Sequence, residues 1–124
     1  MEQKPIVYIA SPYTKGDVAM NVHFQCLIFD QLLTDGRVLP IAPLWSQFQH
    51  LLFPRNYEDW IRYDLGLLRL YDCCLRLRAD IPRLSYEQFE SKGADGEVNQ
   101  FIQMGKPVFT SIEDLYSWLD HLEK

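Results

Sequence analysis

The stretch I-V-Y-I-A-S-P-Y-T-K-G-D, residues 6–17, decides the fold that we predict for this chain. Its first five residues are apolar and largely β-branched, which is typical of a strand buried on both faces of a parallel sheet. A polar loop with proline and glycine follows, and Asp17 is a candidate N-cap for a helix. The apolar residues of that helix recur at helical spacing up to a stop at Asp35-Gly36: Val22, Cys26, Phe29 and Leu33. Strand, loop and helix in this order open a βαβ unit.

The same alternation continues along the chain. Residues 37–43, 71–77 and 107–109 are short apolar runs, and we expect a strand in each. A helix begins at Asn56 or Glu58, with four apolar residues expected to face the core: Trp60, Ile61, Leu65 and Leu68. The last helix is amphipathic, and Ser111, with Asp114 three residues later, caps its start.

This pattern predicts one α/β domain over residues 1–124, a three-layer sandwich with a parallel sheet of four to five strands of the flavodoxin-like or Rossmann-like type. Ligands bind such sheets at the carboxyl ends of the strands, where the strand order reverses. Polar residues expected to converge on that crevice are Tyr8, Ser11, Lys15, Ser91 and Glu97.

Residues 91–107, S-K-G-A-D-G-E-V-N-Q-F-I-Q-M-G-K-P, carry the densest set of candidate site residues. We expect Gly93 and Gly96 to form a tight turn just ahead of a short helix that stops at Gly105. Asp95 and Glu97 then fall in the turn or the first helical turn, where the helix dipole favours carboxylates. Glu97 would stay ionised, as a nucleophile or ribose ligand must. The alternative is that both acids only complement the dipole.

Two other segments have more than one interpretation. Residues 44–57 are rich in aromatic side chains, including Trp45, and either cover the core or form a wall on which a base stacks. Asp64 shares a side with the apolar stripe of its helix and needs a partner or a site; the alternative is an exposed acid that pairs with Arg62 or Arg69. Residues 78–90 form a loop long enough to suggest a function.

Composition excludes several classes of function. The 124 residues have a net charge of −5 and no basic stripe, which argues against a nucleic-acid surface. No apolar run is long enough for a membrane span or a signal peptide, so we expect no membrane partner. The three cysteines, of which Cys73 and Cys74 are adjacent, make no disulfide framework and favour a reducing cytoplasm. On a strand, one of the adjacent pair should pack in the core.

No metal or cofactor is expected. The three histidines lie far apart without ligand-spaced partners. The chain also lacks a G-x-G-x-x-G sequence, a P-loop and a G-x-S-x-G nucleophile elbow.

Four segments together resemble the nucleoside 2-deoxyribosyltransferase superfamily, particularly its small bacterial and phage members and the nucleoside 5′-monophosphate N-glycosidases. They are V-Y-I-A-S-P-Y at 7–13, D-L-G-L-L-R-L-Y-D at 64–72, S-K-G-A-D-G-E-V at 91–98 and M-G-K-P-V-F at 104–109. The resemblance covers nearly the whole chain, and the glycine-rich acidic segment followed by G-K-P-V is its most specific part. It implies a single domain of this type that cleaves the N-glycosidic bond of a nucleoside or nucleoside 5′-monophosphate, by hydrolysis or base exchange.

The resemblance also implies roles for individual residues. Glu97 is similar to the nucleophile, Tyr8 to the tyrosine that orients it, and Asp64 to the aspartate that contacts the sugar or assists catalysis. Ser91 stands where nucleotide-hydrolysing relatives have a phosphate-binding serine, which favours a 5′-phosphorylated substrate. The residues expected to bind substrate are Ser91, Gly93, Asp95, Ser11, Lys15 and Trp45. The first loop has less glycine than in the nucleotide hydrolases.

Two alternatives to a nucleoside-cleaving enzyme stay open. One is a nucleotide-binding sensor or regulatory module that has the fold without turnover, and the other is cleavage of a larger ribosyl substrate such as a dinucleotide. The resemblance further implies a homo-oligomer, at least a dimer. The aromatic segment and the final helix, with Tyr116 and Trp118, are the surfaces expected to face a partner.

Overall fold

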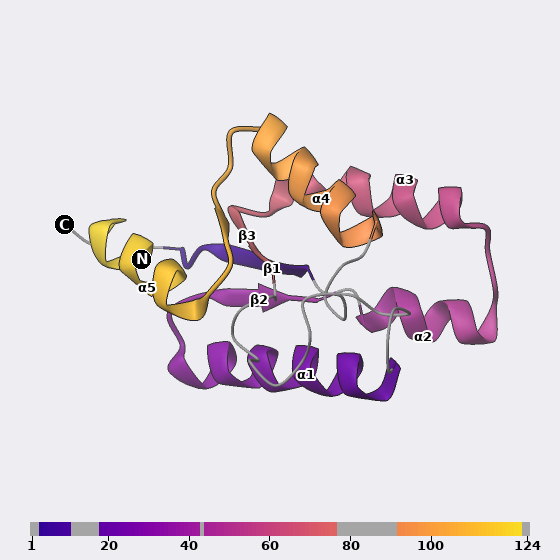
Figure 1. The fold of residues 1–124 in the computed structure, drawn as a ribbon, viewed down its shortest axis with the longest axis horizontal. Coiled ribbons are helices and arrows are strands. Elements are labelled where there is room, and N and C mark those ends of the chain that lie inside the picture. Colours follow the sequence, from indigo (N-terminus) through magenta and orange to yellow (C-terminus); the bar gives the residue numbers. More distant parts are fainter. Residues whose placement is uncertain (1–2, 11–17, 43, 77–91, 123–124) are drawn as a thin grey trace.

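The structure, a computed structural model, describes residues 3–10, 18–42, 44–76 and 92–122. Strands and helices alternate along the chain (Figure 1). The elements are β1 (Ile6–Ala10), α1 (Val18–Asp35), β2 (Leu39–Ile41), α2 (Leu44–Leu52), α3 (Tyr57–Leu67), the 3-10 helix η1 (Leu68–Leu70), β3 (Cys73–Arg76), α4 (Lys92–Gln103), β4 (Val108–Phe109) and α5 (Ile112–Leu122).

The strands form one four-stranded sheet, all parallel, in the order β2-β1-β3-β4. The α/β sandwich of flavodoxin-like or Rossmann-like type is therefore confirmed, with each strand inside the range predicted for it. The chain runs from β1 to β2 in one direction and from β3 to β4 in the other, so the strand order reverses between β1 and β3. At the amino end of this central pair, the Ile6 N–H donates to Asp72 Oδ2 at 2.7 Å, and the Asp72 N–H donates to the Ile6 carbonyl at 2.8 Å.

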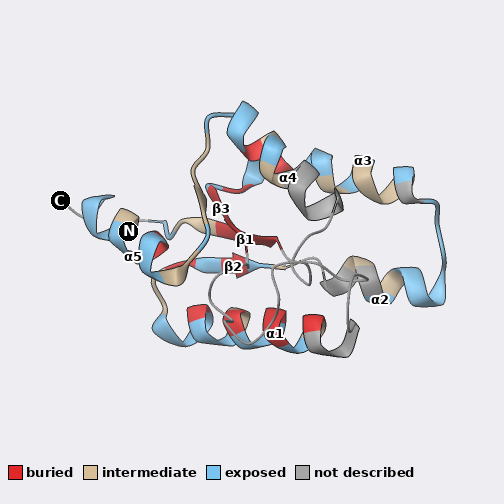
Figure 2. Cartoon of the chain, in the orientation of Figure 1, coloured by how far each residue is buried: buried red, intermediate tan, exposed pale blue. Residues whose placement is uncertain are grey.

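Helices cover both faces of the sheet. Figure 1 shows α1 on one side and α3 and α4 on the other, while α2 lies beyond the carboxyl ends of the strands. The side chains of α5 share a core cluster with those of α1, so α5 covers the same face as α1. Figure 2 shows that burial is concentrated in β1, β3 and the inner sides of α1, α4 and α5. Because β1 and β3 are covered on both faces, their near-continuous apolar sequences are explained.

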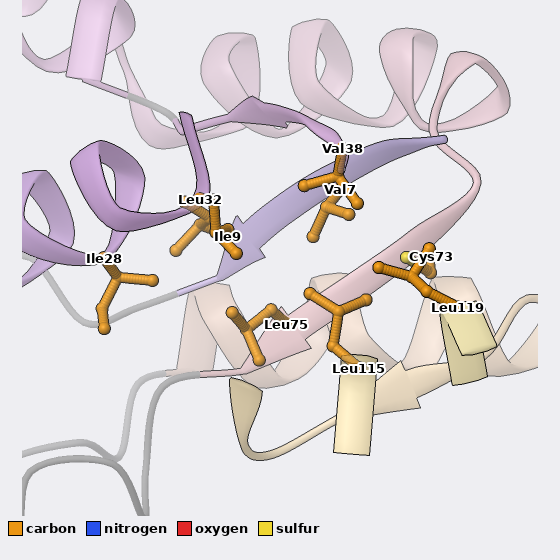
Figure 3. Close-up of a cluster of buried hydrophobic side chains, with 9 residues drawn as sticks. All are labelled: Val7, Ile9, Ile28, Leu32, Val38, Cys73, Leu75, Leu115 and Leu119. Carbon is orange, nitrogen blue, oxygen red and sulfur yellow. The ribbon is translucent and has the colours of Figure 1, made fainter. Parts of the chain in front are cut away.

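Two apolar clusters form the core, one on each face of the sheet. The first joins α1 and α5 to the sheet (Figure 3) and consists of Val7, Ile9, Ile28, Leu32, Val38, Cys73, Leu75, Leu115 and Leu119. The second lies under α4 and consists of Tyr8, Ala10, Leu68, Tyr71, Cys74 and Phe101. Adjacent strand residues point to opposite faces, so Cys73 and Cys74 enter different clusters. Both side chains are buried, whereas we predicted burial for one of them.

Helix ends follow the predicted chemistry in three places. Gly36 and Gly105, which follow α1 and α4, have positive φ angles of 71° and 73°, a conformation that side chains disfavour. The Ser111 Oγ accepts a hydrogen bond from the Asp114 N–H at 3.1 Å, which confirms the N-cap of α5. The start of α4 was predicted wrongly: the helix begins at Lys92, so Gly93 and Gly96 lie within it.

The predicted inner face of the segment from Asn56 to Leu68 is wrong in part. Leu68 is buried at 2% exposure, but Leu65 is 39% exposed, because the chain passes from α3 into η1 and only the end of this segment reaches the second cluster. Among the described side chains of residues 44–57, Phe48 and Phe53 are exposed, so these two do not cover the core. In the described part of the chain, no helix combines the length and the apolar content needed to cross a bilayer.

Candidate active site

The site predicted from topology lies where β1 and β3 end, because the strand order reverses between them. Ala10 and Arg76 are the last residues of these strands and pair in register. Side chains alternate along a strand, so Arg76 shares with Cys74 the face that carries α4. This edge and this face are the frame of the candidate site.

Tyr8 lies on the same face in a stack of buried rings. Its ring centroid is 5.0 Å from that of Tyr71 and 6.0 Å from that of Phe101, with the rings nearly parallel. Tyr8 is only 3% exposed, so its ring belongs to the core. Because Phe101 belongs to α4, the stack also fixes this helix against β1.

Asp64 is a half-buried acid on α3. Burial removes water from its carboxylate and raises its pKa from 3.8 to about 6. Arg62, one of the two partners considered for it, instead pairs with Asp59 at 3.1 Å between Nη2 and Oδ1. Among the described residues Asp64 has no ion-pair partner. It therefore takes up a proton close to neutral pH, as a general acid or base requires.

Asp64 and α4 lie on the same side of the sheet. Asp64 stands one helical turn before Leu68, which is buried in the second cluster, and Val98 of α4 packs against that cluster. Gly93, Asp95 and Glu97 also belong to α4, with position 97 one turn before Phe101. Their side chains are outside the described set. The structure thus places Tyr8, Asp64 and the helix that carries position 97 on one side of the sheet.

The other predicted residues are not tested. Ser11, Lys15 and Ser91 lie outside the described residues. Trp45 belongs to α2, but its side chain is not described, so the base-stacking interpretation stays a prediction. Within the described residues there is no group of three or more histidine, cysteine, aspartate or glutamate side chains that could hold a metal ion.

Lys106 is a positioning residue that we did not predict. Its ammonium group donates to the carbonyls of Leu68 and Arg69, both at 3.1 Å, and of Tyr71 at 2.5 Å. These carbonyls lie at the end of η1, where helical carbonyls lack further helical donors, although that of Leu68 also accepts from the Tyr71 N–H at 3.2 Å. The Lys106 N–H donates to the Phe101 carbonyl of α4 at 2.9 Å, so Lys106 ties the end of the Asp64 segment to the end of the Glu97 helix. The lysine was visible in the G-K-P segment, but nothing in its spacing indicated the contact.

Arg76 is the second residue that sequence analysis missed. It is 2% exposed at the carboxyl end of a central strand. On the opposite face, the described buried side chains of α1 change from polar to apolar along the helix: Asn21 and Gln25 come first, and Ile28 and Leu32 follow. The first half of α1 comes after the carboxyl end of β1 in the chain, so its buried polar groups are those expected near a polar site at that edge. An arginine inside an otherwise apolar strand was the available signal.

Comparisons of this chain with models of protein families, with curated proteins and with solved structures found no match to any of the three.

Proposed function

We propose that this protein cleaves the N-glycosidic bond of a nucleoside or nucleoside 5′-monophosphate, as a member of the nucleoside 2-deoxyribosyltransferase superfamily. The observation that carries the proposal is Asp64, a half-buried acid with a pKa of about 6, on the side of the sheet that carries α4. Retaining glycosidic cleavage uses two carboxyl groups, one of which holds a proton while the other is ionised. Asp64 suits the first role and Glu97 the second.

In the first step, the Glu97 carboxylate attacks the anomeric carbon as the bond from that carbon to the base nitrogen breaks. An ester forms between the sugar and Glu97, through a transition state with oxocarbenium character. The electron pair of the broken bond goes to the base, which receives a proton from the Asp64 carboxyl group. A pKa near the working pH lets Asp64 give up this proton and regain it.

In the second step, water or another base attacks the same carbon and releases Glu97 as a carboxylate. With water, the proton lost by the nucleophile returns to Asp64, which restores both groups. Tyr8 contributes by packing against Phe101 of α4, which holds the helix that carries Glu97 at a fixed height above the sheet. Ser91 and Lys15 are the proposed phosphate ligands, and Ser11, Gly93, Asp95 and Trp45 the other substrate contacts.

Two further parts of the proposal concern the protein's surroundings. Cys26, Cys73 and Cys74 are free thiols, which suits the reducing cytoplasm that we infer. The superfamily resemblance supports a homo-oligomer. The competing proposal is a nucleotide-binding sensor on the same fold. The burial of the Tyr8 ring is compatible with it, because a sensor needs Tyr8 only as a core residue.

The decisive experiment measures release of free base by chromatography from a panel of ribonucleosides, deoxyribonucleosides and their 5′-monophosphates. Wild type is compared with Glu97→Gln and with Glu113→Gln, a matched change at an exposed glutamate in the first turn of α5. We expect release by wild type and Glu113→Gln and none by Glu97→Gln. Dependence on an added base separates a transferase from a hydrolase. Equal release by Glu97→Gln refutes the nucleophile, and saturable binding without release favours the sensor.

A further inference from the structure

A buried arginine lies at the carboxyl end of the central strand β3. Arg76 is 2% exposed and pairs in register with Ala10, the last residue of β1. Removing a guanidinium group from water is costly, so a buried arginine is retained where negative charge or several hydrogen-bond acceptors compensate it. Ligands bind sheets of this type at the same edge. A cation buried there can therefore act on the acids of the site without touching the ligand.

Helix α4 passes over the face that carries Arg76, in the direction opposite to that of the strands. It connects the parallel strands β3 and β4, so it begins at their carboxyl ends and returns to their amino ends. Two contacts fix its height along the sheet. Phe101 stacks on Tyr8 with 6.0 Å between the ring centroids, and beyond the helix the Pro107 carbonyl accepts a hydrogen bond from the Cys74 N–H at 3.0 Å. Phe101 therefore lies at the level of Tyr8.

Position 97 of α4 comes to the level of Arg76. It precedes Phe101 by four residues, a displacement of about 6 Å toward the carboxyl ends of the strands. Ala10 lies two residues beyond Tyr8 on β1, a displacement of about 6.6 Å in the same direction. Ala10 is the register partner of Arg76. Because residues four apart share one side of a helix, position 97 also lies on the side of α4 that carries Phe101.

The charges on this side of the sheet are separated along the strands. The described charged or titratable groups in or beside the second cluster are Tyr8, Asp64, Tyr71, Cys74, Arg76 and Lys106. Lys106 binds carbonyls at the end of η1, toward the amino ends of the strands, so Arg76 is the cation of this group at the carboxyl edge. Arg76 does not act on Asp64: a guanidinium beside a carboxylate lowers its pKa, whereas burial raises the pKa of Asp64 to about 6.

We propose that Arg76 is a positioning residue for the proposed reaction, whose charge holds the carboxyl group of Glu97 in its ionised form. This inference rests on the proposed function and extends it. Glu97 must be ionised to attack the anomeric carbon, while Asp64 must hold the proton that it gives to the base. A guanidinium group at the level of position 97 favours the ionised form there, and burial favours the protonated form of Asp64. One cation placed near one of two acids thus separates their roles.

The pH profile of kcat/KM for base release tests this role. Wild type is compared with Arg76→Gln, with Arg76→Lys, and with Arg37→Gln, a matched loss of a half-buried arginine that pairs with Asp120 of α5 at 2.7 Å. We expect the acid limb, set by Glu97, to move up by about one to two pH units in Arg76→Gln and by less in Arg76→Lys. The limb set by Asp64 should stay in place, and Arg37→Gln should move neither. Lower activity with unmoved limbs would mean that Arg76 is only structural, and overturns the inference.

A second measurement follows the carboxyl carbon of Glu97 by NMR titration and needs no turnover. In wild type its midpoint should lie below that of exposed Glu113 in the first turn of α5, and in Arg76→Gln it should rise by about one to two pH units. If Arg76→Gln does not fold, as judged by circular dichroism, the wild-type comparison decides.

Two outcomes of the titration overturn the inference, whether or not base is released. One is a wild-type midpoint for Glu97 at or above that of Glu113, and the other is an unchanged midpoint in folded Arg76→Gln. The expected shift in a protein that releases no base from any substrate would support the pairing of Arg76 with Glu97 and overturn the proposed function. The two failures are therefore distinguishable.

Discussion

Replacing Asp64 with asparagine should make the protein more stable above pH 6. A carboxyl group whose pKa is raised by folding binds its proton more tightly in the folded state than in the unfolded chain. Its stabilising contribution is complete below pH 3.8 and is lost as the pH rises to about 6, where folded Asp64 ionises. The shift of roughly two units corresponds to at most about 3 kcal/mol, and partial access to water reduces this to about 1–2 kcal/mol. Asparagine cannot ionise, so the Asp64→Asn variant avoids the loss.

Thermal and urea unfolding at about pH 4 and about pH 8 measure this effect. The stability of Asp64→Asn should exceed that of wild type by about 1–2 kcal/mol at the higher pH, a rise of about 5 °C in Tm, with almost no difference at the lower pH. Asp59→Asn is the matched control on the same helix. Asp59 is ion-paired with Arg55 at 3.7 Å and with Arg62 at 3.1 Å, so its removal should not stabilise the protein.

Two results would refute this reasoning. If Asp64→Asn is no more stable than wild type at about pH 8, the carboxylate is not desolvated in the folded protein. If the gain is equal at both pH values, it comes from the amide and not from the lost ionisation. A confirmed gain, together with lost base release, would mean that Asp64 is kept for function at a cost in stability.

Three further changes have expected results. Lys106→Met removes the ammonium donor from three carbonyls at the end of η1, of which that of Leu68 keeps the Tyr71 N–H, and should lower the free energy of unfolding in urea by about 2–3 kcal/mol, with Lys106→Arg in between; a loss below about 0.5 kcal/mol would contradict the role of this ammonium group. Ser111→Ala should cost about 1 kcal/mol in the same assay and Ser111→Asp almost nothing, and equal costs would exclude the cap. Trp60→Phe removes the N–H that binds His50 and should speed amide hydrogen exchange in α2 but not in β1, whereas uniform acceleration would indicate global destabilisation.

The sheet could be predicted because its signals are local. Ile6–Ala10 is an apolar β-branched run, and each later strand is a short apolar run as well, so strand positions and a parallel sheet followed from the alternation of strands and helices. The start of α4 could not be predicted in this way. Glycine is a poor helix former, yet Gly93 and Gly96 lie in the helix, whose packing through Phe101 outweighs their local preference.

The candidate site was predictable only in part, for similar reasons. Asp64 stood out as an acid on an apolar stripe, and its raised pKa agrees with that placement. The burial of Arg76 could not be predicted. A side chain at the carboxyl end of a strand is buried when that strand is central, and the sequence does not give the strand order. The contacts of Lys106 depend on where η1 ends relative to α4. The hydrogen bond from Trp60 to His50 joins α3 to α2 across ten positions, and no apolar spacing in the sequence indicates it.

The hydrogen bonds between Ile6 and Asp72 have a consequence for how the protein is made. They close the central strand pair between residues that are 66 positions apart. Ribosomes add about 5–20 residues per second, so a newly made β1 waits several seconds for its main partner. During that time only the edge strand β2 is available to it, and residues such as Val7 and Ile9 lack the cover that β3 and α5 later provide. We therefore expect the amino-terminal third of the new chain to need protection from aggregation until β3 has been made.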